Sequence, residues 1–356
     1  MQTSTTILSV TLLIATICQI VVAQFNQCTG SDRCININEC ARFGPHFNEP
    51  SKWSDSIRNE FRAKVCQREK SSSGNIYKVC CQKSVTYNSN RKRGLEVLDL
   101  EGCGAYSEDR IAFGQDAKLF QYPWMALLKP KIGSFLCGGT LINERYVLSA
   151  AHCLKHTDIA IVRLGEFDLR NTTDCDKRGE LCAPPPQDIS VERIIVHENY
   201  SARRKVNDIG LIRLARAASF NDNVSPICLP VSPVMRTTLK FYFVAGWGAT
   251  ESAPFSDKLQ FTKLSLLAND ECERQLLIVD PYTKLNDNQI CAIGTKLSDN
   301  CVGDSGGPLK SISVNARYVQ YGLVSFGLPT CGKQSAPGVY TRVESYINWI
   351  LDNLEE

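Results

Sequence analysis

The stretch GDSGGP, residues 303–308, decides how this chain of 356 residues is interpreted. It sets Ser305 behind an acidic residue and among glycines, which allow a tight backbone and close approach to another segment. By itself such a serine is most often part of a turn. A serine hydroxyl is a poor nucleophile near neutral pH and needs a base within hydrogen-bond reach. The motif therefore directs attention to a histidine and a carboxylate elsewhere in the chain.

Two segments supply these groups, in the chain order His, Asp, Ser. LSAAHC, residues 148–153, carries His152, and NDIGLIRL, residues 207–214, carries Asp208. Taken alone, His152 would be a packed core histidine and Asp208 a cap before an apolar strand. The three segments together resemble the signature segments of the chymotrypsin/trypsin family, from about residue 111 to the C-terminus. The resemblance implies an all-β fold of two six-stranded antiparallel barrels with a C-terminal helix.

Hydrophobic patterning independently predicts an all-β region. Strand-length segments rich in Val, Ile, Phe and Tyr alternate with Gly, Pro, Asn or Asp. They lie at residues 124–128, 159–164, 191–196, 209–214, 241–245 and 318–325. From Val343 to Leu354, apolar residues recur at three- and four-residue steps, which predicts one face of a terminal helix.

The resemblance also assigns catalytic roles. His152 would take the proton of Ser305 and return it to the leaving amine, while Asp208 would hold the imidazole in the right tautomer. The backbone N–H groups of Gly303 and Ser305 would face the developing oxyanion.

Substrate preference follows from the same comparison of motifs. Asp299 stands where trypsin-like members carry a carboxylate at the base of the S1 pocket, and Gly327 and Gly338 match the small pocket walls. A buried carboxylate between glycine walls suits the cationic side chain of Arg or Lys. Asn300, where trypsin has Ser, leaves the choice between Arg and Lys open. Phe326 replaces the usual Trp on the substrate-binding segment.

An activation site precedes the protease region. Cleavage after Arg110 would free the amine of Ile111, which would pair with Asp304 and order the oxyanion loop and the S1 pocket. The family usually reads IVGG after the cut, whereas residues 111–114 read IAFG. The activating enzyme must favour Arg, and since Asp299 implies the same preference, self-activation is an open alternative.

Whether the cysteines form disulfides depends on the redox state of the compartment in which the protein folds. Residues 7–23, ILSVTLLIATICQIVVA, are mostly apolar and end in small residues, which predicts a secretory signal peptide at residues 1–23. An uncleaved membrane anchor is the alternative. Loss of Cys18 with the signal leaves 16 of the 17 cysteines, an even number that suits disulfides in an oxidising compartment. The net charge of +3 is too balanced for a nucleic-acid binder.

Six cysteines cluster in a small module, residues 24–81. A module this small needs disulfide bonds for its stability. Zinc binding by these cysteines is an alternative, and their spacing alone does not determine which cysteines pair. The module ends in the adjacent pair Cys80-Cys81 and precedes a protease, an arrangement that resembles the arthropod clip-domain serine proteases. Residues 82–110 are then expected to be a linker and activation peptide, and residues 111–356 the protease domain.

The resemblance implies a disulfide map. The pairs are Cys28–Cys80, Cys34–Cys66, Cys40–Cys81, Cys103–Cys228, Cys137–Cys153, Cys175–Cys182, Cys272–Cys291 and Cys301–Cys331. Cys103–Cys228 would keep the clip module attached after cleavage at Arg110. A second cut at residues 91–93, RKR, would release it, unless this run is only a solvated linker.

Three further features concern surface chemistry. The acceptor motifs N-x-S/T predict glycosylation at Asn171, Asn199 and Asn223. No cofactor is required, but structural calcium is expected at Glu166, Asp168 and Asp176, unless these are surface charges. The basic run at residues 203–205 would border the substrate cleft and favour acidic substrate residues, or else be an exposed loop.

The biological role is implied by the resemblance alone. It is that of a secreted haemolymph zymogen, activated by an upstream trypsin-like protease and controlled by a serpin-type inhibitor. Its substrate would be another zymogen or a cytokine precursor in Toll-type signalling or melanisation, with no nucleic-acid or membrane partner. The alternative is a catalytically silent homologue that acts as a cascade adaptor. The sequence IAFG favours that alternative, whereas the three catalytic residues oppose it.

Overall fold

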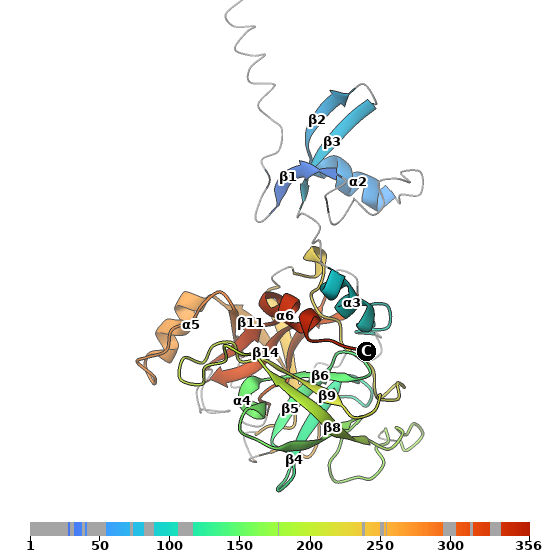
Figure 1. Cartoon of the computed structure of the whole chain (residues 1–356), viewed down its shortest axis with the longest axis vertical. Coiled ribbons are helices and arrows are strands. Elements are labelled where there is room, and N and C mark those ends of the chain that lie inside the picture. Colours follow the sequence, from blue (N-terminus) through green and yellow to red (C-terminus); the bar gives the residue numbers. More distant parts are fainter. Residues whose placement is uncertain are drawn as a thin grey trace, which may run out of the picture. The chain divides into compact units, whose positions relative to one another are not determined.

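The computed structural model describes residues 28, 32–37, 40, 55–71, 74–81, 89–105, 117–176, 178–236, 239–249, 253, 255–294, 304–313, 316–327 and 336–356. The chain divides into two compact units (Figure 1). One comprises Met1–Thr86 with Ser232–Val234, and the other Tyr87–Val231 with Met235–Glu356. The expected signal peptide, Arg110, Ile111, Asp299, Gly303 and the pair Cys301–Cys331 lie outside the described residues.

The N-terminal unit is a small disulfide-stapled sheet with one helix. It contains β1 (Arg33–Asn36), α2 (Asp55–Lys64), β2 (Val65–Ser71) and β3 (Gly74–Cys81), with antiparallel strands in the order β1-β3-β2. Its fully buried apolar residues are few, so covalent links must supply much of the stability. The disulfides are Cys28–Cys80, Cys34–Cys66 and Cys40–Cys81, the pairs that the resemblance implied. These bonds leave no thiolate among the six for zinc.

The second unit begins with a closed antiparallel barrel. Its strands are β4 (Met125–Pro130), β5 (Cys137–Leu141), β6 (Tyr146–Ser149), β7 (Ile159–Leu164), β8 (Gln187–Val196) and β9 (Gly210–Leu214). They pair in the order β4-β5-β6-β9-β8-β7. The short helix α4 (Ala151–Leu154) follows β6 directly. Closure leaves no strand edge unpaired around the barrel.

A second closed barrel completes the fold. Its strands are β10 (Phe241–Gly246), β11 (Gln260–Leu267), β12 (Gln289–Gly294), β13 (Pro308–Ile312), β14 (Tyr318–Gly327) and β15 (Pro337–Arg342), in the order β10-β11-β12-β15-β14-β13. The helical segments are η5 (Pro233–Arg236), α5 (Asn269–Leu276), η6 (Val343–Tyr346) and α6 (Ile347–Asp352). Two six-stranded antiparallel barrels and a terminal helix confirm the predicted fold class.

Four more disulfides lie in this unit, and each is a pair that the resemblance implied. They are Cys103–Cys228, Cys137–Cys153, Cys175–Cys182 and Cys272–Cys291. None of the described helices has both the length and the apolar character needed to cross a membrane.

The segment predicted as a polar linker is in part a docked helix, α3 (Ser89–Val97). Figure 1 shows α3 beside α6, and Arg91 donates two hydrogen bonds to Asp352 of α6, from Nε at 3.0 Å and from Nη2 at 2.9 Å. The side-chain amide of Asn143 also donates to the carbonyl of Val97 at 3.1 Å. The basic run 91–93 is therefore held in a helix, a conformation that a protease must unwind before it can cut.

Gly94→Ala should loosen this helix. A Cβ at residue 94 would lie 2.3 Å from the backbone oxygen of Leu351, which cannot move aside like a flexible side chain. Overpacking of this kind costs about 1–3 kcal/mol. We expect faster tryptic cleavage at residues 91–93, located by mass spectrometry of the released fragment. Glu96→Ala, an exposed change on the same helix, should leave the rate unchanged, and equal rates for both variants would contradict the docking.

Candidate active site

Strand pairing brings His152 and Asp208 together. Ser149, the last residue of β6, pairs with Gly210, the first residue of β9. His152 follows that end of β6 in α4, and Asp208 precedes the start of β9. Because the strands are antiparallel, both side chains emerge at the same end of the barrel.

The carboxylate of Asp208 holds the histidine at two points. The Nδ1 atom of His152 lies 2.8 Å from Oδ2 of Asp208, and the backbone N–H of His152 donates to Oδ1 at 2.9 Å. Asp208 is buried, with 5% of its side chain exposed, whereas 32% of the His152 side chain is exposed. A buried carboxylate at Nδ1 favours the tautomer in which the exposed Nε2 is free to accept a proton.

Ser325 completes this hydrogen-bond network, and the sequence analysis gave it no role. Its hydroxyl donates to Oδ2 of Asp208 at 2.5 Å, and the hydroxyl of Thr341 donates to the backbone oxygen of Asp208 at 2.8 Å. Both residues come from the second barrel, on β14 and β15. The only signal for Ser325 was its place beside Phe326 and Gly327, the expected substrate-binding segment.

The second barrel supplies Ser305, just before β13. The backbone N–H of Gly138, on β5 of the first barrel, donates to the carbonyl of Ser305 at 2.8 Å. Gly306 has φ +78°, and a Cβ there would lie 2.3 Å from the hydroxyl of Ser149. Only glycine meets both conditions. The glycine after the serine thus allows the two barrels to meet at the site.

The S1 and activation residues are described in part. Gly327 and Gly338 face each other as a register pair of β14 and β15, which puts both expected wall residues at one place. Oδ1 of Asp304 accepts the backbone N–H of Gly248 at 2.9 Å. Asp299, Gly303, Arg110 and Ile111 lie outside the described residues, so their roles stay predictions.

Comparison with known proteins decides the family. Residues 111–350 match the Trypsin family. The chain is 41% identical to Phenoloxidase-activating factor 3 of Holotrichia diomphalia, over 90% of each chain. It belongs to the clip-domain serine proteases. It is also 39% identical to the CLIP domain-containing serine protease HP8 of Bombyx mori, over 95% of this chain and 97% of that protein.

A solved structure agrees with this assignment. The crystal structure of the Drosophila Grass clip serine protease of the Toll pathway superposes with a TM-score of 0.67. It is 31% identical, over 92% of this chain and 97% of the other. The prediction of an arthropod clip-domain protease is confirmed.

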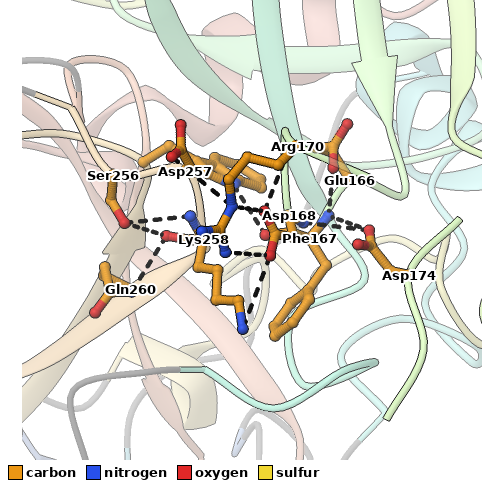
Figure 2. A network of polar contacts seen from close by, with 10 residues as sticks. Glu166, Phe167, Asp168, Arg170, Asp174, Ser256, Asp257, Lys258 and Gln260 are labelled. Atoms are coloured by element: carbon orange, nitrogen blue, oxygen red, sulfur yellow. Dashed lines mark hydrogen bonds and ion pairs between the residues drawn. The ribbon is translucent and has the colours of Figure 1, made fainter. Parts of the chain in front are cut away.

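The acidic loop of this clip-domain protease does not gather the expected calcium ligands (Figure 2). Asp168 accepts two hydrogen bonds from Arg170, at 2.7 and 2.8 Å, and lies 3.7 Å from the ammonium of Lys258. Arg170 holds the pKa of Asp168 below its usual value. Asp176 is partly exposed, and its Oδ1 accepts the backbone N–H groups of Glu180 and Leu181 in its own turn.

Glu166 instead has Asp174 as its acidic neighbour. Burial, and then the charge of Asp174, raise the pKa of Glu166. Oδ1 of Asp174 is buried without a hydrogen-bond partner among the described residues. No three carboxylates within the described ranges converge closely enough to share an ion. The structure does not bring Glu166, Asp168 and Asp176 together, and Asp168 has cationic partners, so calcium at these residues stays a prediction.

The three expected glycosylation sites differ in solvent exposure. Asn171 and Asn199 are exposed, so the prediction stands at both. Asn223 is 5% exposed, and its amide donates to the carbonyl of Gly165 at 2.6 Å. A glycan on this nitrogen would break that bond, so glycosylation at Asn223 would require the side chain to leave its buried position and stays a prediction.

Proposed function

We propose that the chain is a secreted zymogen that becomes a serine endopeptidase on cleavage after Arg110. The observation that carries the proposal is the Asp208–His152 pair, in which the carboxylate of Asp208 is buried and the side chain of His152 is partly exposed to solvent. All three catalytic residues are present, and Ser325 adds a second donor to the aspartate.

The proposed reaction uses only groups of the chain and needs no cofactor. The hydroxyl oxygen of Ser305 attacks the substrate carbonyl while Nε2 of His152 takes its proton. Asp208 stabilises the imidazolium through the Nδ1–H bond. The N–H groups of Gly303 and Ser305 stabilise the oxyanion, and His152 then protonates the leaving amine. Water repeats the sequence on the acyl-enzyme and releases the acid product.

Specificity for Arg and Lys rests on Asp299 and on the register of Gly327 with Gly338. Glycine on both walls leaves room for a long side chain, and a carboxylate at the base would form a charge-assisted hydrogen bond with it. Similarity to a phenoloxidase-activating factor and to a clip serine protease of the Toll pathway supports an extracellular cascade with a protein substrate. An upstream protease that cuts after Arg would start the activation.

Cleavage of the purified zymogen after Arg110 should release activity on peptides that end in Arg or Lys. Ser305→Ala, cleaved in the same way, should show none, because no other hydroxyl can replace the nucleophile. The measurement is hydrolysis of Arg-, Lys- and Phe-ending fluorogenic peptides before and after cleavage. A cleaved wild-type protein that is inactive on all of them would support the adaptor alternative instead.

A further inference from the structure

The protease domain contains a cleft of about 640 Å³ that is lined by none of the catalytic residues. Three segments form it: the turn at residues 203–206 between β8 and β9, the loop at residues 280–286 between α5 and β12, and Phe326 near the end of β14. Aromatic side chains, Tyr282 and Phe326, line the cleft together with charged side chains.

Positive charge dominates the walls. Arg203, Arg204, Lys205 and Lys284 line the cleft, against the single carboxylate of Asp280. Nζ of Lys205 lies 2.8 Å from Oδ2 of Asp280 and holds the pKa of that carboxyl below its usual value. No acidic side chain of the described segments pairs with the other three cations, so their charges stay uncompensated. Like charges gathered in a concave site attract anions.

The basic turn is held in a fixed shape. Lys205 has φ +51°, and its carbonyl accepts a hydrogen bond from Nε2 of Gln289 at 2.9 Å. Its ammonium lies 4.8 Å from the ring centroid of Phe326, and the backbone N–H of Arg204 donates to the hydroxyl of Ser201 at 3.3 Å. The backbone of this turn is therefore already ordered and loses little entropy when a ligand binds.

The cleft adjoins the catalytic centre. Phe326 lies between Ser325, which bonds to Asp208, and Gly327 of the expected S1 wall. The pairing of β14 with β13 ends at Leu323, whereas its pairing with β15 continues to Gly327. Among the described residues, one edge of this part of β14 has no strand partner. An extended peptide can add along such an edge.

Peptide direction follows from this edge. If the Arg or Lys side chain of a substrate enters beside Gly327, the residues before it run along Phe326 into the cleft. Successive side chains of an extended peptide are about 3.3 Å apart along the strand and point to opposite faces, so alternate ones face the basic walls.

We propose that this cleft selects substrates with acidic side chains just before the cleaved Arg or Lys, and that a second copy of this chain is one such substrate. The inference rests on the proposed protease function. Its own activation sequence reads Glu108-Asp109-Arg110, two acids directly before the expected cut. A cleaved molecule would then cleave and activate uncleaved copies.

Peptide substrates test the cleft. The activated enzyme should hydrolyse Ser-Glu-Asp-Arg about tenfold better, in kcat/KM, than the neutral Ser-Gln-Asn-Arg. The preference should shrink as salt rises, because exposed charges are screened. The paired substitution Arg204→Glu with Lys284→Glu should reverse the preference, which is measured as the ratio of kcat/KM for the acidic peptide to kcat/KM for the neutral one. Arg216→Glu with Lys240→Glu, at two exposed residues outside the cleft, is the charge-matched control.

The zymogen tests the second part of the proposal, that one copy of this chain cleaves another. The Ser305→Ala zymogen cannot cut itself, so cleavage after Arg110 by added activated wild type measures attack on a second copy. It should be cut, and about tenfold more slowly when it also carries Glu108→Gln with Asp109→Asn.

Four outcomes are distinguishable. Peptide preference, its reversal and the slower cut together support the proposal. Equal rates for the acidic and neutral peptides overturn the cleft assignment while leaving the protease function intact. An uncut Ser305→Ala zymogen overturns self-activation. Inactivity on every Arg- or Lys-ending peptide contradicts the proposed function itself.

Discussion

Asp208→Asn should lower kcat of the activated enzyme by about 10⁴-fold near neutral pH, as this change does in other Ser-His-Asp proteases. The structure shows why the loss is chemical. The amide oxygen can still accept the backbone N–H of His152, which Oδ1 now accepts at 2.9 Å. The amide nitrogen then faces Nδ1 of His152 and the hydroxyl of Ser325, in place of Oδ2.

An amide nitrogen only donates, so Nδ1 of His152 must become an acceptor. The ring proton then sits on Nε2, the nitrogen that has to take the proton of Ser305. The hydroxyl of Ser325 can rotate to accept the amide's second proton, so the buried network stays satisfied and the fold should persist. Catalysis is lost through the tautomer, with little change in shape.

The measurement is kcat on an Arg-ending peptide together with the thermal unfolding midpoint. Asp222→Asn, at an exposed carboxylate, is the matched control and should retain the wild-type rate. A rate for Asp208→Asn within tenfold of wild type would contradict the assigned role of Asp208. An equally large loss accompanied by a collapsed unfolding midpoint would point to a folding defect.

The sequence predicted the parts of the fold that are encoded by local pattern. All six expected strands correspond to observed ones, and the terminal helix forms. The strands that were not predicted include β5, CGGTL, and β15, PGVYTR, which are rich in small residues. These strands pack closely around the active site, where the backbone N–H of Gly138 donates to the carbonyl of Ser305. Such close approach requires glycine, and glycine removes the hydrophobic pattern from which a strand is predicted.

What the sequence did not predict depends on contacts between distant segments. Ser325 acts on Asp208 from 117 residues away, and its neighbours Phe326 and Gly327 mark it only as part of the expected substrate-binding segment. Asn223 carries a valid acceptor motif, yet its amide is needed by Gly165 across the fold. The sequence around Asp168 suggests a calcium ligand, and only the structure shows Arg170 and Lys258 around it.

Lys310 is the residue that departs most from the sequence expectation. A lysine in the strand PLKSI would normally face solvent, yet its side chain is fully buried. Nζ lies 3.9 Å from the ring centroid of Tyr122 and has no hydrogen-bond partner among the described residues. Burial lowers the pKa of Lys310 to about 7, although the charge of Asp304 acts in the opposite direction.

Lys310→Met should therefore stabilise the protein, most strongly at low pH. Below pH 7 the lysine is protonated in both folded and unfolded chains, and the full cost of burying the charge is present. Between about pH 7 and its usual pKa of 10.5, the unfolded chain binds a proton that the folded chain does not. The destabilisation caused by burying Lys310 therefore decreases as pH rises in this range, and it disappears near pH 10.5.

A shift of this size corresponds to about 5 kcal/mol below pH 7. Attraction of a desolvated ammonium to an aromatic ring offsets about 2 kcal/mol of it. We expect Lys310→Met to raise the free energy of unfolding by about 3 kcal/mol at pH 6 and by about 3 kcal/mol less at pH 9, where little of the gain is left. Methionine is unbranched and apolar, so it can fill the same space.

Urea unfolding of the intact zymogen at the two pH values measures the difference, with Lys240→Met as the exposed control. A gain for Lys310→Met that is equal at pH 6 and pH 9 would mean that the buried lysine does not titrate between them. A loss of stability at pH 6 would mean that Asp304 and Tyr122 compensate the buried charge in full. Lys310 would then be a stabilising internal cation, held between the ring of Tyr122 and the carboxylate of Asp304.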